Sequence, residues 1–488
     1  MRTAAILLLI LWFSRIPALE ALPLHNDEGL HLTRAVEVWK LHPFWEIRDG
    51  KIINQWAIAL FYPQNAPVFA GRIATVFVGL IGFAAGYALI RRLFGSSAAL
   101  VAGVLWIASP YLFFFDRLAL SDAEAGALVV LALWASWRLA ERGTIRRAIF
   151  AGLALALATL FKFTAAPFAV SVALIMLLRA RYPLQRRLML LVVVGIVVAL
   201  CFVAPVGYLM LRKEDLFSIA LGWIGGGSSG ASVGQVGIGP NLAMLWAQLI
   251  GFSLPIWSAM MLVGLVLLLI VRPRKGGLLL LAVGLPLASI IVLGREVLPR
   301  HYVVALPALL ILGGSGIGVA LDRWLASKAQ RQRAMAVTSA ALAVGFIPFA
   351  LHAYTAPDQL RVPEAVWTQY FSEHSAGYGL REAVLAFPQT ITPRDILVIA
   401  SMTADSCHRA NFYAVDGMSM VCPDAPGLPE IGAALKDHGE VYVLVDFATG
   451  AHFPEDAQVL NAQTEQIAIY PRPGADGQPV TLWKLTSH

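Results

Sequence analysis

Eleven apolar runs, separated by polar loops of different lengths, constrain this chain more than any other feature. The chain has 488 residues, of which 58% are hydrophobic and only 14% are charged, and its mean hydropathy is +0.70. A soluble domain has no interior large enough to bury so much apolar surface. A bilayer accommodates it, because a helix of about 20 apolar residues spans the hydrocarbon. Since the runs are continuous rather than alternating, they predict a polytopic α-helical membrane protein and not a membrane β-barrel.

The loops between the apolar runs alternate in charge. Every second loop is rich in Arg and Lys, and loops of that kind remain in the cytoplasm. The other loops are therefore predicted to lie outside, in a membrane part at 1–354 with a first external loop at about 20–72. We expect the first helix to be uncleaved rather than a signal peptide. The predicted transmembrane helices cover about 3–19, 73–90, 98–115, 123–139, 148–161, 165–179, 188–209, 243–271, 277–293, 302–320 and 334–353.

The tail, residues 355–488, is polar and is predicted to be extracytoplasmic. It contains the short β-like runs "DILVIAS", "VYVLVDF", "EQIAIY" and "VTLWKLT", with helix-like stretches between some of them. This pattern predicts a small α/β domain. Cys407 and Cys422 lie in it, and in an oxidising compartment the two can form a disulfide. A zinc site is not indicated, because only His408 is a further ligand nearby.

The formal net charge of +7 arises from the loop clusters. No basic stripe with interleaved aromatic residues occurs, so nucleic acid is not an expected partner. Membrane lipids are an expected partner.

An acidic pair opens the first external loop, in "HNDEGLHLTRAVEVW". One interpretation of Asp27 and Glu28 is a helix N-terminus, where the helix dipole favours carboxylates. The other is catalysis, since an aspartate at the water interface can take the proton of an acceptor hydroxyl.

A second acidic group lies where the third span turns into the fourth, in "FDRLALSDAEAG". Ser121 or Asp122 can cap the fourth helix, with Glu124 in its first turn. Asp116 and Arg117 directly follow the apolar "YLFFF". Charges so close to hydrocarbon are costly unless they are paired or functional.

External cations form the third group. Lys162 lies in "ATLFKFTAAP", and Arg72 lies at the start of the second span. Snorkelling to the interface explains each of them singly. External loops are poor in such cations, however, and several from different loops indicate an anionic ligand such as phosphate. The donor-phosphate candidates are Arg72, Arg117, Lys162, Arg295, Arg300, His301 and Tyr302.

A carboxylate base and several cations on the outer face of a membrane fit one chemistry. A phosphate leaving group needs charge stabilisation, and an acceptor hydroxyl needs a base. A lipid-linked donor explains the membrane location. We therefore expect transfer of a sugar from a polyprenyl phosphate.

Several motifs resemble the GT-C superfamily of membrane glycosyltransferases, in the branch of protein O-mannosyltransferases and lipid A aminoarabinose transferases. They are "HNDEG", "NAPVFAGRIATVFVG", "LALSDA", "GLALALATLFKFTAAPFAV" and "REVLPRHYVVALPALLIL", within roughly residues 1–320. The resemblance implies a hexosyl- or pentosyltransferase that inverts the anomeric centre. It also implies no cofactor and no catalytic metal, although related oligosaccharyltransferases use a divalent ion, for which Asp27, Glu28 and Asp122 are the candidate ligands.

The resemblance also implies roles for single residues. Asp27 matches the catalytic base of the family, with Glu28 supporting it, and Asp122 matches the acidic residue after the third helix. Lys162 and Arg72 match contacts to the donor phosphate. The later "RY" of the family reads "RHY" here, so either Arg300 or His301 takes the cation role with Tyr302.

Other interpretations remain open at this stage. A transporter or flippase of a lipid-linked or anionic substrate would also carry buried charges and broken helices, although here the polar groups gather at one face. A ligase with a lipid diphosphate donor would have its large loop later in the chain, and a scaffold would leave the external cations unexplained. The Gly-rich loop 225–239 is either a flexible connection or a gate. A lipid, a glycan and a protein are all candidate acceptors, and Arg- and Ala-rich usage suggests a bacterial cytoplasmic membrane.

Overall fold

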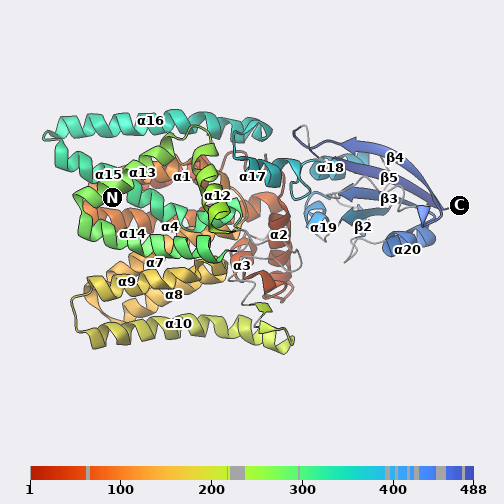
Figure 1. Ribbon diagram of the computed structural model, residues 1–488. Helices are drawn as coiled ribbons and strands as arrows, with labels where there is room; N and C mark the ends of the chain where they lie inside the picture. Colours follow the sequence, from red (N-terminus) through yellow and green to blue (C-terminus); the bar gives the residue numbers. More distant parts are fainter. Residues whose placement is uncertain are drawn as a thin grey trace. The chain divides into compact units, whose positions relative to one another are not determined.

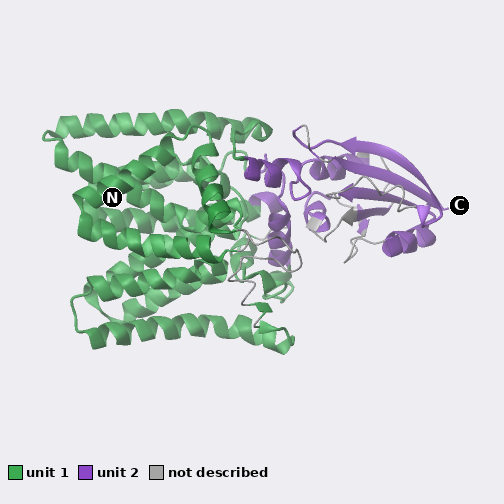
Figure 2. Cartoon of the chain, viewed as in Figure 1, with its two compact units in different colours: residues 1–19, 37–62, 70–363 green, residues 20–36, 63–69, 364–488 purple. Residues whose placement is uncertain are grey.

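The computed structural model describes residues 2–61, 66–216, 218–219, 237–294, 297–390, 396–401, 405–414, 418–421, 428–446, 458–474, 477 and 479–487 (Figure 1). Two compact units divide the chain (Figure 2). Unit 1 comprises residues 1–19, 37–62 and 70–363. Unit 2 comprises residues 20–36, 63–69 and 364–488, so it combines most of the predicted tail with two segments of the predicted first external loop.

Unit 1 is helical. Its helices are α1 (Arg2–Arg15), η1 (Ile47–Asp49), α3 (Asn54–Ala59), α4 (Pro67–Phe94, which starts in unit 2), α5 (Ser96–Ile107), α6 (Pro110–Asp116), α7 (Ser121–Arg142), α8 (Ile145–Phe161), η2 (Phe163–Phe168), α9 (Ala169–Arg179), α10 (Leu184–Leu211), α12 (Ile238–Gly251), α13 (Ile256–Val271), α14 (Pro273–Leu293), η3 (Pro299–Val304), α15 (Leu306–Trp324), α16 (Lys328–Thr355) and η4 (Pro357–Gln359).

A helix forms at each of the eleven predicted apolar runs. Within the described ranges, six helices are long and apolar enough to span a membrane, and eight spans result if each of two bent pairs counts as one. The helices at the other three runs, α1, α8 and the η2–α9 pair, are shorter than 18 residues. A helical, multi-pass membrane protein is therefore confirmed, and the number of about 11 crossings stays a prediction.

Two predicted single helices are broken. The run at 98–115 forms α5 and α6, which meet at 64°, and the run at 243–271 forms α12 and α13, which meet at 116°. Proline explains both breaks, because it lacks an N–H and clashes with the preceding turn. Pro110 begins α6 after Ser109, whose hydroxyl accepts from Leu112 N. Pro255 precedes α13.

Helix α15 packs very closely on its neighbours through glycine. A Cβ atom on Gly264 of α13 would lie 1.9 Å from the carbonyl oxygen of Gly313, and one on Gly318 would lie 2.4 Å from Ala98 Cα of α5. Small residues of this kind let membrane helices approach backbone to backbone. The contact explains why "GGSGIG" occurs within a spanning helix.

Unit 2 contains a five-stranded mixed sheet. Its elements after residue 363 are α17 (Glu364–Trp367), the π-helical turn η5 (Thr368–Ser372), α18 (Leu380–Thr390), β1 (Ile396–Ser401), α19 (Asp405–Asn411), β2 (Ser419–Val421), α20 (Leu428–His438), β3 (Glu440–Asp446), β4 (Ala462–Tyr470) and β5 (Val480–Ser487). The strand order is β2-β1-β3-β5-β4, with β1 parallel to β2 and β3 and with β5 antiparallel to β3 and β4. All four β-like runs of the sequence are strands, which confirms a C-terminal mixed sheet.

Alternation along the strands divides the core of unit 2 into two layers. Leu397 and Ile399 of β1 pack with α18 and α19, whereas Val398 packs on the opposite face with Ile431 and Leu435 of α20. Successive side chains of a strand point to opposite faces, so one apolar strand serves both layers.

Cys407 of α19 lies in the first layer and is disulfide-bonded, while Cys201 is free. Cys422, its predicted partner, lies outside the described residues, and the pairing stays a prediction.

A buried charge network closes the end of β3. Asp446 accepts hydrogen bonds from Arg472 and, at 3.1 Å and 2.8 Å, from Arg409 Nη2 and Ser406 Oγ. Burial alone would raise the pKa of this carboxyl, but the two guanidiniums outweigh burial and hold the pKa below its usual value. Arg409 also donates to the carbonyl oxygens of residues 374–376. The network therefore fixes the chain before α18 to the sheet.

The substitution Asp446→Asn is expected to destabilise unit 2 by about 3–5 kcal/mol, because it leaves two buried guanidiniums without their carboxylate. Hydrogen exchange of the β3 amides in the full chain measures the effect. The exposed Asp437→Asn on α20 is the matched control and should change protection little. Because the pKa of Asp446 is lowered on folding, its contribution is complete above about pH 4 and is lost as the pH falls through the lower folded value. Equal protection in both variants would show that the network contributes nothing.

Candidate active site

A buried ion pair lies at the turn between α8 and η2. Helix α8 ends at Phe161, and Lys162 adopts an extended conformation. Its Nζ donates to Asp122 Oδ1 at 2.5 Å, and both side chains are more than nine-tenths buried. Asp122 belongs to the first turn of α7, where the helix dipole also favours a carboxylate. The capping interpretation of Ser121 and Asp122 is wrong, because Leu120 is the N-cap residue of α7 and no side chain caps it.

A loop from the segment predicted to be the first external loop pairs with this turn. Ile52 N and Ile53 N both donate to Leu160 O, at 2.8 Å and 3.1 Å, and Phe163 N donates to Gly50 O. These bonds bring Lys51 beside the turn, within electrostatic reach of Lys162. Lys51 Nζ pairs with Asp49 Oδ2 at 3.2 Å and is mostly buried. Sequence reasoning missed this lysine, because nothing in "DGKIINQW" shows that the loop folds back onto α8.

Arg300 completes what we call the cation cluster, which is Lys51, Lys162 and Arg300. It belongs to η3, is half-buried and also lies within electrostatic reach of Lys162. The next two residues, His301 and Tyr302, make hydrogen bonds to the backbone. His301 Nδ1 accepts from Leu298 N at 3.3 Å, and the Tyr302 hydroxyl donates to Asn241 O at 2.5 Å. Of the "RHY" residues, Arg300 is thus the cation that joins Lys162.

Asn54, directly after the paired loop, is a buried amide. It is fully buried at the start of α3, and neither its oxygen nor its nitrogen has a hydrogen-bond partner among the described residues. Buried polar atoms are almost always hydrogen-bonded, so an unpaired amide beside a cation cluster indicates a ligand position. No motif or charge pattern in the sequence pointed to Asn54.

Two of the candidate arginines, Arg117 and Arg72, donate hydrogen bonds to backbone carbonyl groups at and just after the end of α1. Arg117 donates to the carbonyl oxygens of Arg15, Pro17 and Ala18 at 2.7–2.8 Å, and Arg72 donates to Leu19 O at 2.5 Å. Cations suit the C-terminal end of a helix, where carbonyl groups lack partners.

Asp116, like Arg117, is buried beside hydrocarbon and paired. Its Oδ2 accepts from Arg15 Nε at 3.1 Å. The charges that follow "YLFFF" are thus paired within unit 1, and we leave Arg72 and Arg117 out of the cation cluster. Arg295 lies outside the described residues, as do residues 225–236 of the Gly-rich loop.

Helix α2 (Asn26–Trp39) carries the acidic pair in its first turn. Glu28 is fully buried, and its Oε2 accepts from His25 N at 3.0 Å, so it caps the helix. Asp27 is only half-buried, and its N–H donates to His25 Nδ1 at 3.2 Å. The interpretation as a helix N-terminus therefore suits Glu28, and Asp27 is the member of the pair that solvent reaches.

The C-terminal part of unit 2 holds the start of α2. Asn26 N donates to Ser375 O at 3.0 Å, and the ring of His25 stacks on Tyr370 with 4.5 Å between centroids. A Cβ atom on Gly29 would lie 2.7 Å from Arg409 Cγ, so the helix approaches α19 closely. The same Arg409 belongs to the Asp446 network. The sheet of unit 2 thus orients the helix that carries Asp27.

No three His, Cys, Asp or Glu side chains are grouped as metal ligands within the described ranges. Asp27, Glu28 and Asp122, the candidate ligands from the sequence, do not form such a group there.

Residues 49–209 match the family model described as dolichyl-phosphate-mannose-protein mannosyltransferase. The matched segment contains Lys51, Asp122 and Lys162. A comparison with curated protein sequences finds no match.

Solved structures share the fold over nearly the whole chain. ArnT from Cupriavidus metallidurans matches in the apo state, with a TM-score of 0.61 and 17% identity, and bound to undecaprenyl phosphate, with a TM-score of 0.62 and 16% identity. Both alignments cover 99% of this chain and 97% of ArnT. The arabinofuranosyltransferase AftD from Mycobacteria matches with a TM-score of 0.52 and 14% identity, over 100% of this chain and 39% of AftD. These likenesses confirm an ArnT-like fold.

Proposed function

We propose that this chain, with a mannosyltransferase family match at residues 49–209 and the fold of ArnT, transfers a sugar from a polyprenyl-phosphate donor to an acceptor hydroxyl. The observation that carries the proposal is the buried Lys162–Asp122 pair with Lys51 and Arg300 within electrostatic reach. Several cations gathered at a loop turn suit an anionic headgroup. One ArnT structure was solved with undecaprenyl phosphate bound, which supports a lipid of this class as the carrier.

The reaction is proposed as a direct displacement with inversion. The acceptor oxygen forms a bond to the anomeric carbon as the bond from that carbon to the phosphate oxygen breaks. Asp27 takes the proton of the acceptor hydroxyl. The polyprenyl phosphate leaves with the bonding electron pair, and Lys162, Lys51 and Arg300 stabilise the charge that develops on it. Asp122 holds Lys162 in position.

The proposed setting is the outer face of a bacterial cytoplasmic membrane. The positive-inside pattern of the loops supports it, because the cation cluster lies at loops predicted to be external. With the same orientation, the sheet of unit 2 is extracytoplasmic, and a disulfide at Cys407 is chemically stable there.

Reconstitution with labelled donors tests the proposal. Purified protein in liposomes is given a panel of polyprenyl phosphates carrying radiolabelled hexoses or pentoses, together with a membrane extract as acceptor source. We expect one donor to be cleaved, with label appearing in the acceptor and free polyprenyl phosphate appearing in equal amount. If the labelled lipid instead crosses the bilayer intact, the chain is a flippase and the proposal is wrong.

A further inference from the structure

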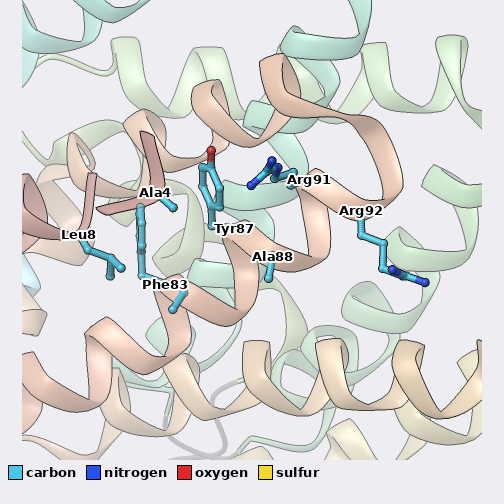
Figure 3. Close-up of a pocket in the computed structure, with 8 residues that line it drawn as sticks. Ala4, Leu8, Phe83, Tyr87, Ala88, Arg91 and Arg92 are labelled. Carbon is cyan, nitrogen blue, oxygen red and sulfur yellow. The ribbon is translucent and has the colours of Figure 1, made fainter. Parts of the chain in front are cut away.

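A groove between α1 and α4 lies away from the cation cluster in sequence and is not used by the proposed reaction. The two helices touch where Trp12 meets Phe77, with 4.9 Å between ring centroids. Beyond this contact, a cavity of about 570 Å³ separates the first turns of α1 from the last turns of α4. Small-molecule sites measure roughly 300–1,000 Å³, so the groove is large enough for part of a lipid. Its lining residues are Ala4, Leu8, Phe83, Ala84, Tyr87, Ala88, Arg91 and Arg92 (Figure 3).

The lining changes from apolar to cationic along α4. Phe83, Ala84 and Ala88 present hydrocarbon, and Tyr87 and Arg91 follow one another on the same side of the helix (Figure 3). Arg92 is already paired, since its Nε lies 2.8 Å from both carboxylate oxygens of Glu141 on α7. The Arg91 guanidinium is exposed and makes no ion pair within the described part of the chain. The Arg91 guanidinium is therefore available to an anion at the end of the apolar part of the groove.

We propose that this groove binds an anionic phospholipid, with an acyl chain along Ala84 and Ala88 and its phosphate at Arg91. Charge complementarity selects this occupant, because a neutral lipid would leave the guanidinium without a counterion. Basic pockets between transmembrane helices on the cytoplasmic side bind anionic headgroups in this way. Arg91 lies at the helix end that the sequence predicts to be cytoplasmic, where anionic phospholipids are available. The inference does not depend on the proposed transfer reaction.

Native mass spectrometry of the full chain in detergent tests the inference. The protein is titrated with phosphatidylglycerol or with phosphatidylcholine, and the retained lipid is counted. We expect wild type to prefer phosphatidylglycerol about fivefold, which corresponds to about 1 kcal/mol for one cation near a headgroup. Arg91→Gln should abolish this preference, and Ala88→Trp, which fills the groove, should reduce retention of the lipid itself. Ala88 is exposed, so the larger side chain does not overpack the core.

Two controls match these variants. Arg333→Gln removes an exposed arginine from α16, and Leu153→Trp adds an indole to the exposed face of α8. Both should bind phosphatidylglycerol as wild type does, and thermal unfolding verifies that every variant is folded. A preference that survives Arg91→Gln, or retention that survives Ala88→Trp, overturns the proposal. So does displacement of phosphatidylglycerol by an equal concentration of undecaprenyl phosphate, which would identify a polyprenyl lipid as the occupant.

Discussion

Replacing Asp27 with asparagine is expected to reduce sugar transfer at least a hundredfold and to leave donor binding unchanged. A positioned general base contributes roughly 10²–10⁴ in rate, and the amide cannot accept the acceptor proton. Asp27 is the half-buried member of the acidic pair, whereas Glu28 is engaged with His25 N. Initial rates with labelled donor measure the transfer, and donor dissociation constants measure binding.

The matched variant is Glu28→Gln, which keeps an oxygen for His25 N and removes only the charge. It should retain most of the activity. If Asp27 serves only the helix dipole, Asp27→Asn costs about 0.3–1 kcal/mol of stability and the transfer rate stays at the wild-type value. That result would reject Asp27 as the base. The two roles are thus separated by rate and stability measured on the same protein.

The apolar runs predicted where the helices of this fold lie, but not where two of those helices bend. Each predicted apolar run forms a helix, because a hydrocarbon solvent leaves the backbone no other way to satisfy its hydrogen bonds. The β-like runs of the tail are strands, because successive side chains of a strand point to opposite faces. Leu397 thereby enters one layer of the core and Val398 the other. A bend, by contrast, depends on one proline and its local contacts. The run at 243–271 looked continuous, yet α12 and α13 meet at 116°.

The candidate site was only partly accessible from sequence. Lys162 and Asp122 stood out as charges beside hydrocarbon, and their pairing explains how such charges are tolerated. Lys51 and Asn54 could not be selected, because their position depends on backbone hydrogen bonds to Leu160 that no side-chain pattern encodes. Arg117 was selected by its location, and its guanidinium donates to the carbonyl groups of Arg15, Pro17 and Ala18. A contact of Arg117 with the donor phosphate stays a prediction.

The contacts between the tail and the helix that carries Asp27 were also not predictable from the sequence. Sequence placed Asp27 in a loop after the first span and treated the sheet as a separate domain. In unit 2 the two are joined, because Asn26 bonds Ser375 and Gly29 lies against Arg409. These contacts bridge more than 340 positions of the chain and involve backbone atoms and one glycine. These contacts of unit 2 therefore orient the helix that carries Asp27, the candidate base.

The Lys162–Asp122 pair allows stability and donor binding to be separated in one mutant cycle. Lys162→Met alone leaves a buried carboxylate without its partner and is expected to destabilise unit 1 by about 3–5 kcal/mol. The double variant Lys162→Met, Asp122→Asn removes both charges, and such neutral replacements often restore stability. Binding of polyprenyl phosphate should nevertheless stay weaker than in wild type by about ten- to hundredfold, the value of a hydrogen bond to a charged group.

Equilibrium binding of a labelled polyprenyl phosphate, beside thermal unfolding in the same detergent, gives both quantities. Lys328→Met, on the exposed first turn of α16, is the matched control for loss of a lysine and should bind as wild type does. If the stable double variant binds polyprenyl phosphate with wild-type affinity, Lys162 serves only to neutralise Asp122. The phosphate site would then have to be sought at Lys51 and Arg300 alone. If affinity falls while stability recovers, the lysine contacts the phosphate, since a purely structural pair would lose and regain both properties together.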